Sequence, residues 1–193
     1  MLSSKIPMDA LKIFLNARHW QLFLIYVSLT AVSIVASGAV GDDEGSMVTL
    51  VFSLFLLLFQ ITWIFAIGLG MYNRIPENLR TGSGYFTFSY AFTILASAGI
   101  IYYISDDASI NDYDITPLFI LVPVLIFTAW SILYIMYFST TMLVTAERGR
   151  KITTSDLFPW ILAMVYFPVG VWMIQPKVNA VIDLKDMTAE GLS

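Results

Sequence analysis

The stretch SMVTLVFSLFLLLFQITWIFAIGLGMY, residues 46–72, contains no Asp, Glu, Lys, Arg or His. A helix rises 1.5 Å per residue, so about 20 apolar residues cross the ~30 Å hydrocarbon core of a bilayer. A water-soluble helix of this length would carry a polar face. The stretch therefore predicts a transmembrane helix that is longer than the core and must tilt or protrude.

Three similar runs, residues 20–40, 86–104 and 116–144, also lack charged side chains and histidine. The chain of 193 residues is 58% hydrophobic and 12% charged, whereas soluble domains carry roughly 25% charged residues. A helix satisfies its own backbone polar groups, which lipid requires. We predict an all-α polytopic membrane bundle with four transmembrane helices, forming one membrane domain over residues 1–193.

The loops between these runs alternate in charge. The leader and the second and fourth loops are basic, with Lys5, Lys12, Arg18, Arg74, Arg80, Arg148, Arg150 and Lys151. The first and third loops are acidic and lack bases, with Asp42, Asp43, Glu44, Asp106, Asp107, Asp112 and Asp114. Lys and Arg are retained on the cytoplasmic side of an inserting helix. The alternation predicts a cytoplasmic N-terminus.

Residues 7–19 predict an amphipathic helix in the cytoplasmic interface, leading into the first span. Met8, Leu11 and Leu15 share one helical face. The opposite face is polar and carries Asp9, Lys12, Asn16 and His19.

The last apolar segment, residues 157–179, has two interpretations. Pro168 lies near its middle, where proline breaks a helix, and Gly170 permits a reversal of the chain. We favour a re-entrant hairpin, which returns Lys177 to the cytoplasmic side and leaves residues 180–193 as a cytoplasmic tail. The alternative is a proline-kinked fifth span, since the segment is long enough to cross.

Few polar side chains lie within the four spans. The amide of Gln60 is costly to leave unpaired in lipid. We expect an interhelical hydrogen bond from it, with a pore contact as the alternative. Ser89, Thr93 and Ser97 recur every four residues in the third span. Such a stripe is typical of close helix packing and, less often, of a polar path.

Two short motifs mark the ends of the chain. One is His19-Trp20-Gln21-Leu22-Phe23, and the other runs from Phe167-Pro168-Val169-Gly170-Val171-Trp172 to Gln175-Pro176-Lys177-Val178-Asn179. Together they resemble a group of small membrane proteins from Bacteroidota-type bacteria with an HWQLF-like entry and an FPxGxWxxQPKxN-like ending. The resemblance implies a bacterial inner membrane and no assigned activity.

These motifs also suggest a polar cluster. A re-entrant segment would return Gln175, Lys177 and Asn179 to the cytoplasmic boundary that holds His19, Trp20 and Gln21. The alternative is that these residues reach the interface independently and share no role.

Several kinds of site are excluded. The chain has no cysteine and one histidine, so thiolate metal sites, disulfides and bis-histidine haem ligation within one chain cannot form. Spans without ionisable side chains argue against proton-coupled transport. No Walker, HExxH or GxSxG pattern occurs. We therefore expect no enzyme activity, no cofactor, no metal and no nucleic-acid partner.

The leading functional hypothesis is a non-catalytic accessory, scaffold or assembly protein of the bacterial inner membrane. It would work through helix–helix contacts with other membrane proteins or with further copies of itself, within the lipid bilayer. The alternative is a small oligomeric channel or facilitator lined by Gln60, Ser89, Thr93 and Ser97.

Overall fold

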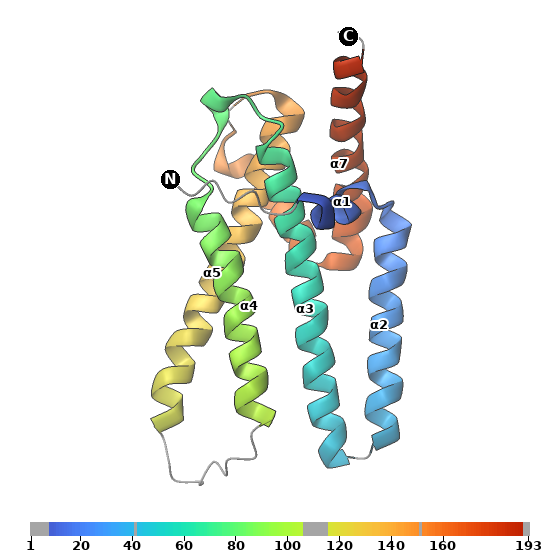
Figure 1. The fold of residues 1–193 in the computed structure, drawn as a ribbon, viewed down its shortest axis with the longest axis vertical. Helices are drawn as coiled ribbons and strands as arrows, with labels where there is room; N and C mark the ends of the chain where they lie inside the picture. The colour runs from blue at the N-terminus through green and yellow to red at the C-terminus, as the bar shows by residue number, and fades with distance from the viewer. Residues whose placement is uncertain (1–7, 41, 106–115, 151, 191–193) are drawn as a thin grey trace. The chain divides into compact units, whose positions relative to one another are not determined.

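The computed structural model describes residues 8–40, 42–105, 116–150 and 152–190, and every regular element in these ranges is helical (Figure 1). The helices are α1 (Met8–Asn16), α2 (His19–Val40), α3 (Asp42–Tyr72), α4 (Gly84–Ser105), α5 (Thr116–Arg148), α6 (Phe158–Val165) and α7 (Phe167–Glu190). Two short 3-10 helices, η1 (Glu77–Leu79) and η2 (Thr154–Asp156), lie between them.

Among the described residues, four helices are long and apolar enough to cross a membrane. The qualifying stretches are His19–Ala39, Val48–Tyr72, Gly84–Tyr102 and Phe119–Arg148. The predicted all-α class with four membrane-crossing helices is therefore confirmed. The chain is an integral membrane protein whose helices contact the lipid bilayer.

The predicted boundaries need some correction. Helix α3 begins at Asp42 rather than at residue 46, because acidic residues are well accommodated in the first turn of a helix. Helix α1 ends at Asn16, three residues earlier than predicted, and α5 continues to Arg148. The acidic loop with Asp106, Asp107, Asp112 and Asp114 lies outside the described residues.

The chain forms two compact units. The larger unit comprises Met1–Thr81 and Met136–Ser193, and the smaller unit comprises Gly82–Ile135. Helix α5 begins in the smaller unit and ends in the larger one.

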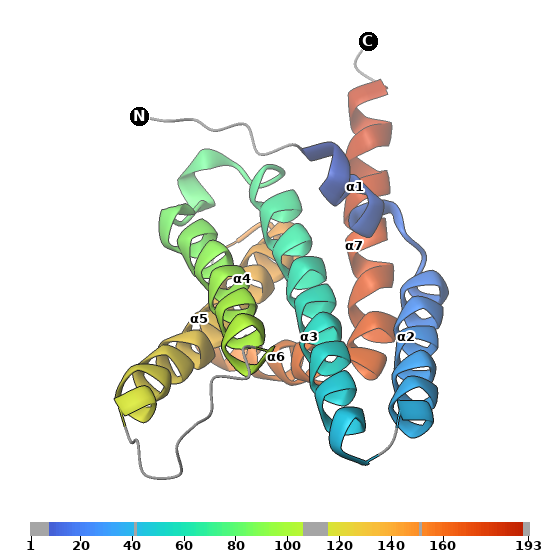
Figure 2. The same ribbon diagram turned by 60° about the horizontal axis from the view of Figure 1, so that its bottom comes forward.

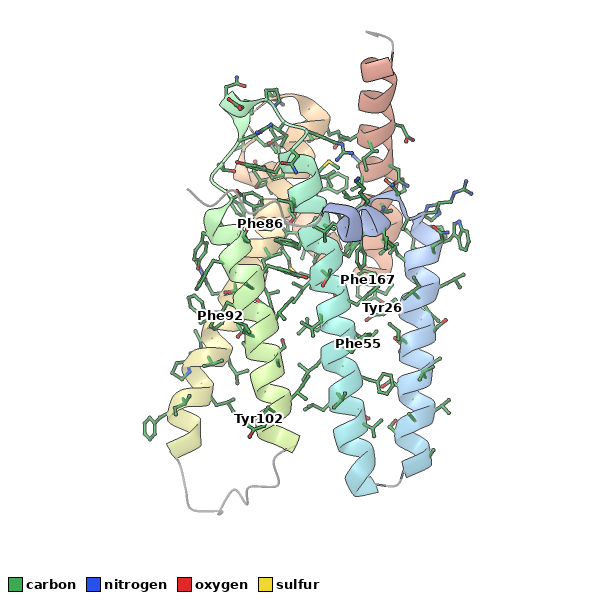
Figure 3. All side chains as sticks on the ribbon, in the orientation of Figure 1. Tyr26, Phe55, Phe86, Phe92, Tyr102 and Phe167 are labelled. Carbon is green, nitrogen blue, oxygen red and sulfur yellow. The ribbon has the colours of Figure 1, made fainter. Side chains whose placement is uncertain are left out.

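The core of the larger unit surrounds the second half of α3, where every residue from Trp63 to Met71 is buried. Helices α1 and α2 both pack on α3, and α7 packs on α1 and α2. At the base of α7 the buried ring of Phe167 contacts Tyr26 at 4.7 Å, Trp63 at 5.1 Å and Phe59 at 5.8 Å between ring centroids (Figure 3). Phe167 thereby joins α7 to α2 and α3.

The C-terminal segment is a helical hairpin of α6 and α7 (Figure 2). Lys177 on α7 lies 4.2 Å from the ring of Trp160 on α6 and 2.6 Å from Glu147 near the end of α5. The second limb therefore returns to the end from which the first began, as the favoured interpretation predicted, and the segment is not one straight span.

The details of this hairpin differ from the prediction. The turn lies at Tyr166, and Pro168 occupies the first turn of α7, where a missing N–H group costs nothing. Residues 180–190 are helical and do not form a separate tail. Helix α7 continues into these residues because Val178, Val181 and Ile182 are buried on one face. Their spacing of three and four residues is that of an amphipathic helix.

In the smaller unit α4 pairs with the first part of α5 through aromatic rings. Tyr85 contacts Tyr134 and Phe92 contacts Phe127, each at 4.6 Å between centroids. Trp130 of α5 does not take part in this pairing and is 60% exposed.

Candidate functional site: a junction of three helices

Helix α1 docks on α3 at a glycine. Leu11 and Leu15 form the buried face of α1, as the amphipathic pattern predicted. A Cβ atom at Gly70 would lie 2.7 Å from Cδ1 of Leu15. The missing side chain at Gly70 therefore lets α1 lie directly against α3, which is the close approach that small residues permit.

The end of α1 is closed by Gln175 from α7. The last four carbonyls of a helix have no partner inside it. The amide nitrogen Nε2 of Gln175 donates to the carbonyl oxygens of Phe14 at 3.0 Å, Leu15 at 3.2 Å and Ala17 at 2.9 Å. Because Gln175 is fully buried, water does not replace it, and without its amide these carbonyls would have no hydrogen-bond donor.

The oxygen atom of the Gln175 amide links α7 to α3. The indole Nε1 of Trp63 donates to its oxygen Oε1 at 2.9 Å. Nε2 also approaches Oδ1 of Asn179 at 3.2 Å, and Nδ2 of Asn179 donates to the Ala17 carbonyl at 3.4 Å. One side chain thus joins α1, α3 and α7, and we call this set of contacts the Gln175 junction.

A second glutamine closes a second helix end. Nε2 of Gln60 on α3 donates to the carbonyl oxygens of Met164 at 2.7 Å and Val165 at 3.2 Å, at the end of α6. This is an interhelical hydrogen bond of the expected kind, with a backbone acceptor. Nearby, the Ser139 hydroxyl on α5 donates to the Ile64 carbonyl at 2.8 Å.

The hairpin itself depends on a close backbone contact. A Cβ atom at Gly170 would lie 2.1 Å from the carbonyl oxygen of Ala163. The only positive φ angle among the described residues belongs to Gly149. Gly170 is therefore needed for its missing side chain, and the expectation that it would supply unusual backbone freedom was wrong.

The structure places four of the six predicted boundary residues in three groups. Gln175 and Asn179 share the Gln175 junction at Ala17. The His19 ring packs against the Trp172 ring at a tilt of 55°, with 4.5 Å between centroids, so it lies beside the junction in sequence but makes different contacts. Lys177 instead pairs with Glu147 and lies over Trp160.

The remaining two boundary residues face outward. Gln21 accepts a hydrogen bond from the backbone N–H of Arg18 at 2.8 Å and so caps the start of α2. Trp20 is 43% exposed. The predicted cluster is therefore partly assembled, around Gln175 rather than around His19.

The hydroxyl stripe of α4 lies in the smaller unit. Ser89, Thr93 and Ser97 are all buried. Thr93 donates to the Ser89 carbonyl and Ser97 to the Thr93 carbonyl, each at 2.8 Å. These two hydroxyls thus bond within their own helix, as serine and threonine in apolar helices often do.

The sequence did not identify the outer face of α2 as a candidate site. Its inner face buries Leu22 and Ser33, whereas the opposite face is exposed. That outer face carries several small residues, Ser28, Ala31, Gly38 and Ala39. Ser28 and Ala31 are three residues apart, and Gly38 follows Ala31 by seven, which keeps all of them on one side of the helix. Only the packing of α2 shows that this side is uncovered.

The chemistry of these contacts is that of amides, hydroxyls and aromatic rings. Within the described ranges, no group of three or more His, Cys, Asp or Glu is placed to hold a metal ion.

Comparisons with family models, with curated proteins and with solved structures find no match to this chain.

Proposed function

We propose that this protein is a non-catalytic accessory or assembly protein of a bacterial inner membrane, which binds another membrane helix through the outer face of α2. The exposed small residues of that face carry the proposal. Association of helices in lipid depends on close backbone approach, which small side chains allow. Only 11% of the apolar window of α2 is buried within the chain, so most of its surface is open to a partner.

The internal polar contacts support this role over a channel. Gln60, the amide that would line a path, closes the end of α6 inside the larger unit. Thr93 and Ser97 bond to carbonyls of their own helix. A water-filled path needs polar groups free to contact the permeant species. Gln60 instead stabilises the larger unit, which also contains α2.

Crosslinking along α2 tests the proposal, because the chain contains no cysteine. A photoreactive benzophenone maleimide is attached to Ala31→Cys on the outer face or to Ser33→Cys on the inner face. We expect protein adducts in native membranes from position 31 and none from position 33. Adding Gly38→Ile should remove the adduct at position 31, because a bulky side chain separates the two backbones.

A matched substitution on another helix provides the control. Ala98→Ile enlarges an exposed residue of α4 and should leave the adduct at position 31 unchanged. Equal adducts from positions 31 and 33, or an adduct insensitive to Gly38→Ile, would rule out the outer face of α2 as the contact. The size of the adduct distinguishes a second copy of the chain from a different partner.

We further propose that the N-terminus and the C-terminal hairpin ends face the cytoplasm. All ten Lys and Arg residues of the sequence fall in the larger unit. The start of α2, the end of α5 and the return limb α7 lie toward the same end of that unit (Figure 1). This clustering supports the orientation expected from retention of positive charge inside the cell.

Thiol labelling measures this orientation. An impermeant maleimide should label Asp107→Cys in intact spheroplasts. Arg150→Cys and Asp183→Cys should react only after permeabilisation. Asp183 is the informative position, because it is exposed on α7 beyond the contacts of Lys177 with Trp160 and Glu147. Labelling of Asp183→Cys from outside would place the C-terminal limb across the membrane and contradict the proposed topology.

A further inference from the structure

Two buried hydroxyl groups of the smaller unit differ from their neighbours in hydrogen bonding. Ser89 on α4 and Ser131 on α5 are 0% exposed. Within the described ranges, neither hydroxyl oxygen has a hydrogen-bond partner. The hydroxyls of Thr93 and Thr128, by contrast, donate to carbonyls of their own helices at 2.8 Å and 2.7 Å. A buried polar group without a protein partner is uncommon, and a bound water molecule is one regular reason for it.

The two serines lie at the same level of the pair formed by α4 and α5. They are bracketed by two pairs of aromatic rings, each with 4.6 Å between centroids: Tyr85 with Tyr134, and Phe92 with Phe127. On each helix the serine lies four residues from one of these aromatic residues and three from the other. Residues three or four apart share a helical face. The antiparallel ring pairs therefore place Ser89 and Ser131 across from each other.

The ring pairs hold the two helices apart at this level, because an aromatic side chain extends much farther from the backbone than a serine hydroxyl. The ring pairs are separated by seven residues on each helix, which is about 10 Å along the helix axis. Between them the two serine side chains are short, and no hydrogen bond joins them. Because both serines are enclosed by protein, a lipid headgroup or a partner helix cannot reach them.

We propose that Ser89 and Ser131 bind one water molecule between α4 and α5. A serine hydroxyl carries one donor and two acceptor lone pairs, so a single water molecule can bond to both side chains at once. Buried waters typically bond to polar groups that are otherwise unsatisfied. The ligand is neutral, because residues 86–104 and 116–144 contain no charged side chain. This inference is independent of the proposed contact through α2.

Water-edited solid-state NMR of the full chain in lipid vesicles tests the inference. Magnetisation passes from water protons to nearby protein sites, and its build-up is fast where a water molecule is bound. We expect faster build-up at Ser89 and Ser131 than at Ser139. Ser139 is the matched control, because it is also buried but its hydroxyl already donates to the Ile64 carbonyl. Ser139 lies eight residues nearer than Ser131 to the charged end of α5, so closeness to bulk water alone would favour Ser139.

Ser89→Ala tests whether the two serines share the water molecule. It should slow the build-up at Ser131 to the rate at Ser139, although Ser131 itself is unchanged. Ser97→Ala removes a buried hydroxyl of α4 that bonds to the Thr93 carbonyl, and it should leave the build-up at Ser131 as it was. Equal rates at Ser131 and Ser139 in the natural chain would overturn the proposal, because the serine hydroxyls would then bond to the protein alone. Equally fast build-up at Ser89, Thr93 and Ser97 would also overturn it, by revealing a continuous water-filled path along α4.

Discussion

Replacing Gly170 by alanine should lower the free energy of unfolding by about 3 kcal/mol, at the upper end of what overpacking usually costs. The added Cβ atom would lie 2.1 Å from the carbonyl oxygen of Ala163. That oxygen belongs to the backbone of α6, so it cannot move aside without opening the hairpin. Gly170→Val should prevent folding altogether. Reversible unfolding in mixed detergent measures the alanine variant.

Two other glycines give graded controls. At Gly70 the new Cβ atom would meet only the flexible end of Leu15, so Gly70→Ala should cost about 1–2 kcal/mol. At Gly99 the space is open, and Gly99→Ala should change stability by less than about 1 kcal/mol. If Gly170→Ala proved as mild as Gly99→Ala, the close contact between α6 and α7 would not exist in the protein.

The four spans could be predicted because their signal is local. An apolar run longer than the hydrocarbon core has few alternatives to a membrane helix. The return of the C-terminal segment was also predictable, since the charge on Lys177 favours one side of the membrane and Pro168 lies where a break is needed. The exact turn was not predictable, because proline is tolerated just after a break as well as at it.

The Gln175 junction could not be predicted, because its partners lie far apart in sequence. Nothing in residues 14–17 shows that a helix ends there under a buried amide. The motif around Gln175 and Asn179 marked the right residues, but their predicted neighbour was His19. The hydrogen-bond partners of a buried side chain depend on which helix end lies beside it. Here the end of α1 lies beside Gln175 because Leu15 packs on Gly70.

Gln175→Leu should destabilise the protein by about 3 kcal/mol, because it leaves several buried groups without partners. The carbonyls of Phe14 and Leu15 would lose their donor and the Trp63 indole would lose its acceptor. Leucine is close to glutamine in size, so the packing volume changes little. Gln21→Leu, which removes one hydrogen bond at an exposed site, should cost no more than about 1 kcal/mol.

The loss of stability in Gln175→Leu should affect helix α1 first and the rest of the chain only afterwards. Helix α1 contributes one short amphipathic face, and a helix of this length is not stable alone in water. Without its cap it should detach from α3, and trypsin should then cleave after Lys12 and Arg18 faster than in the natural chain. Cleavage after Lys177 should be unchanged, since its contacts with Glu147 and Trp160 remain.

A double-mutant cycle with Trp63→Phe separates the junction from general loss of packing. Residues that share a hydrogen bond are not additive, whereas independent sites are. We expect the double variant to be more stable than the sum of the single losses implies, by about 1 kcal/mol. Strict additivity together with unchanged cleavage after Arg18 would mean that Gln175 does not hold α1. Helix α1 would then owe its orientation to the Leu15–Gly70 contact alone.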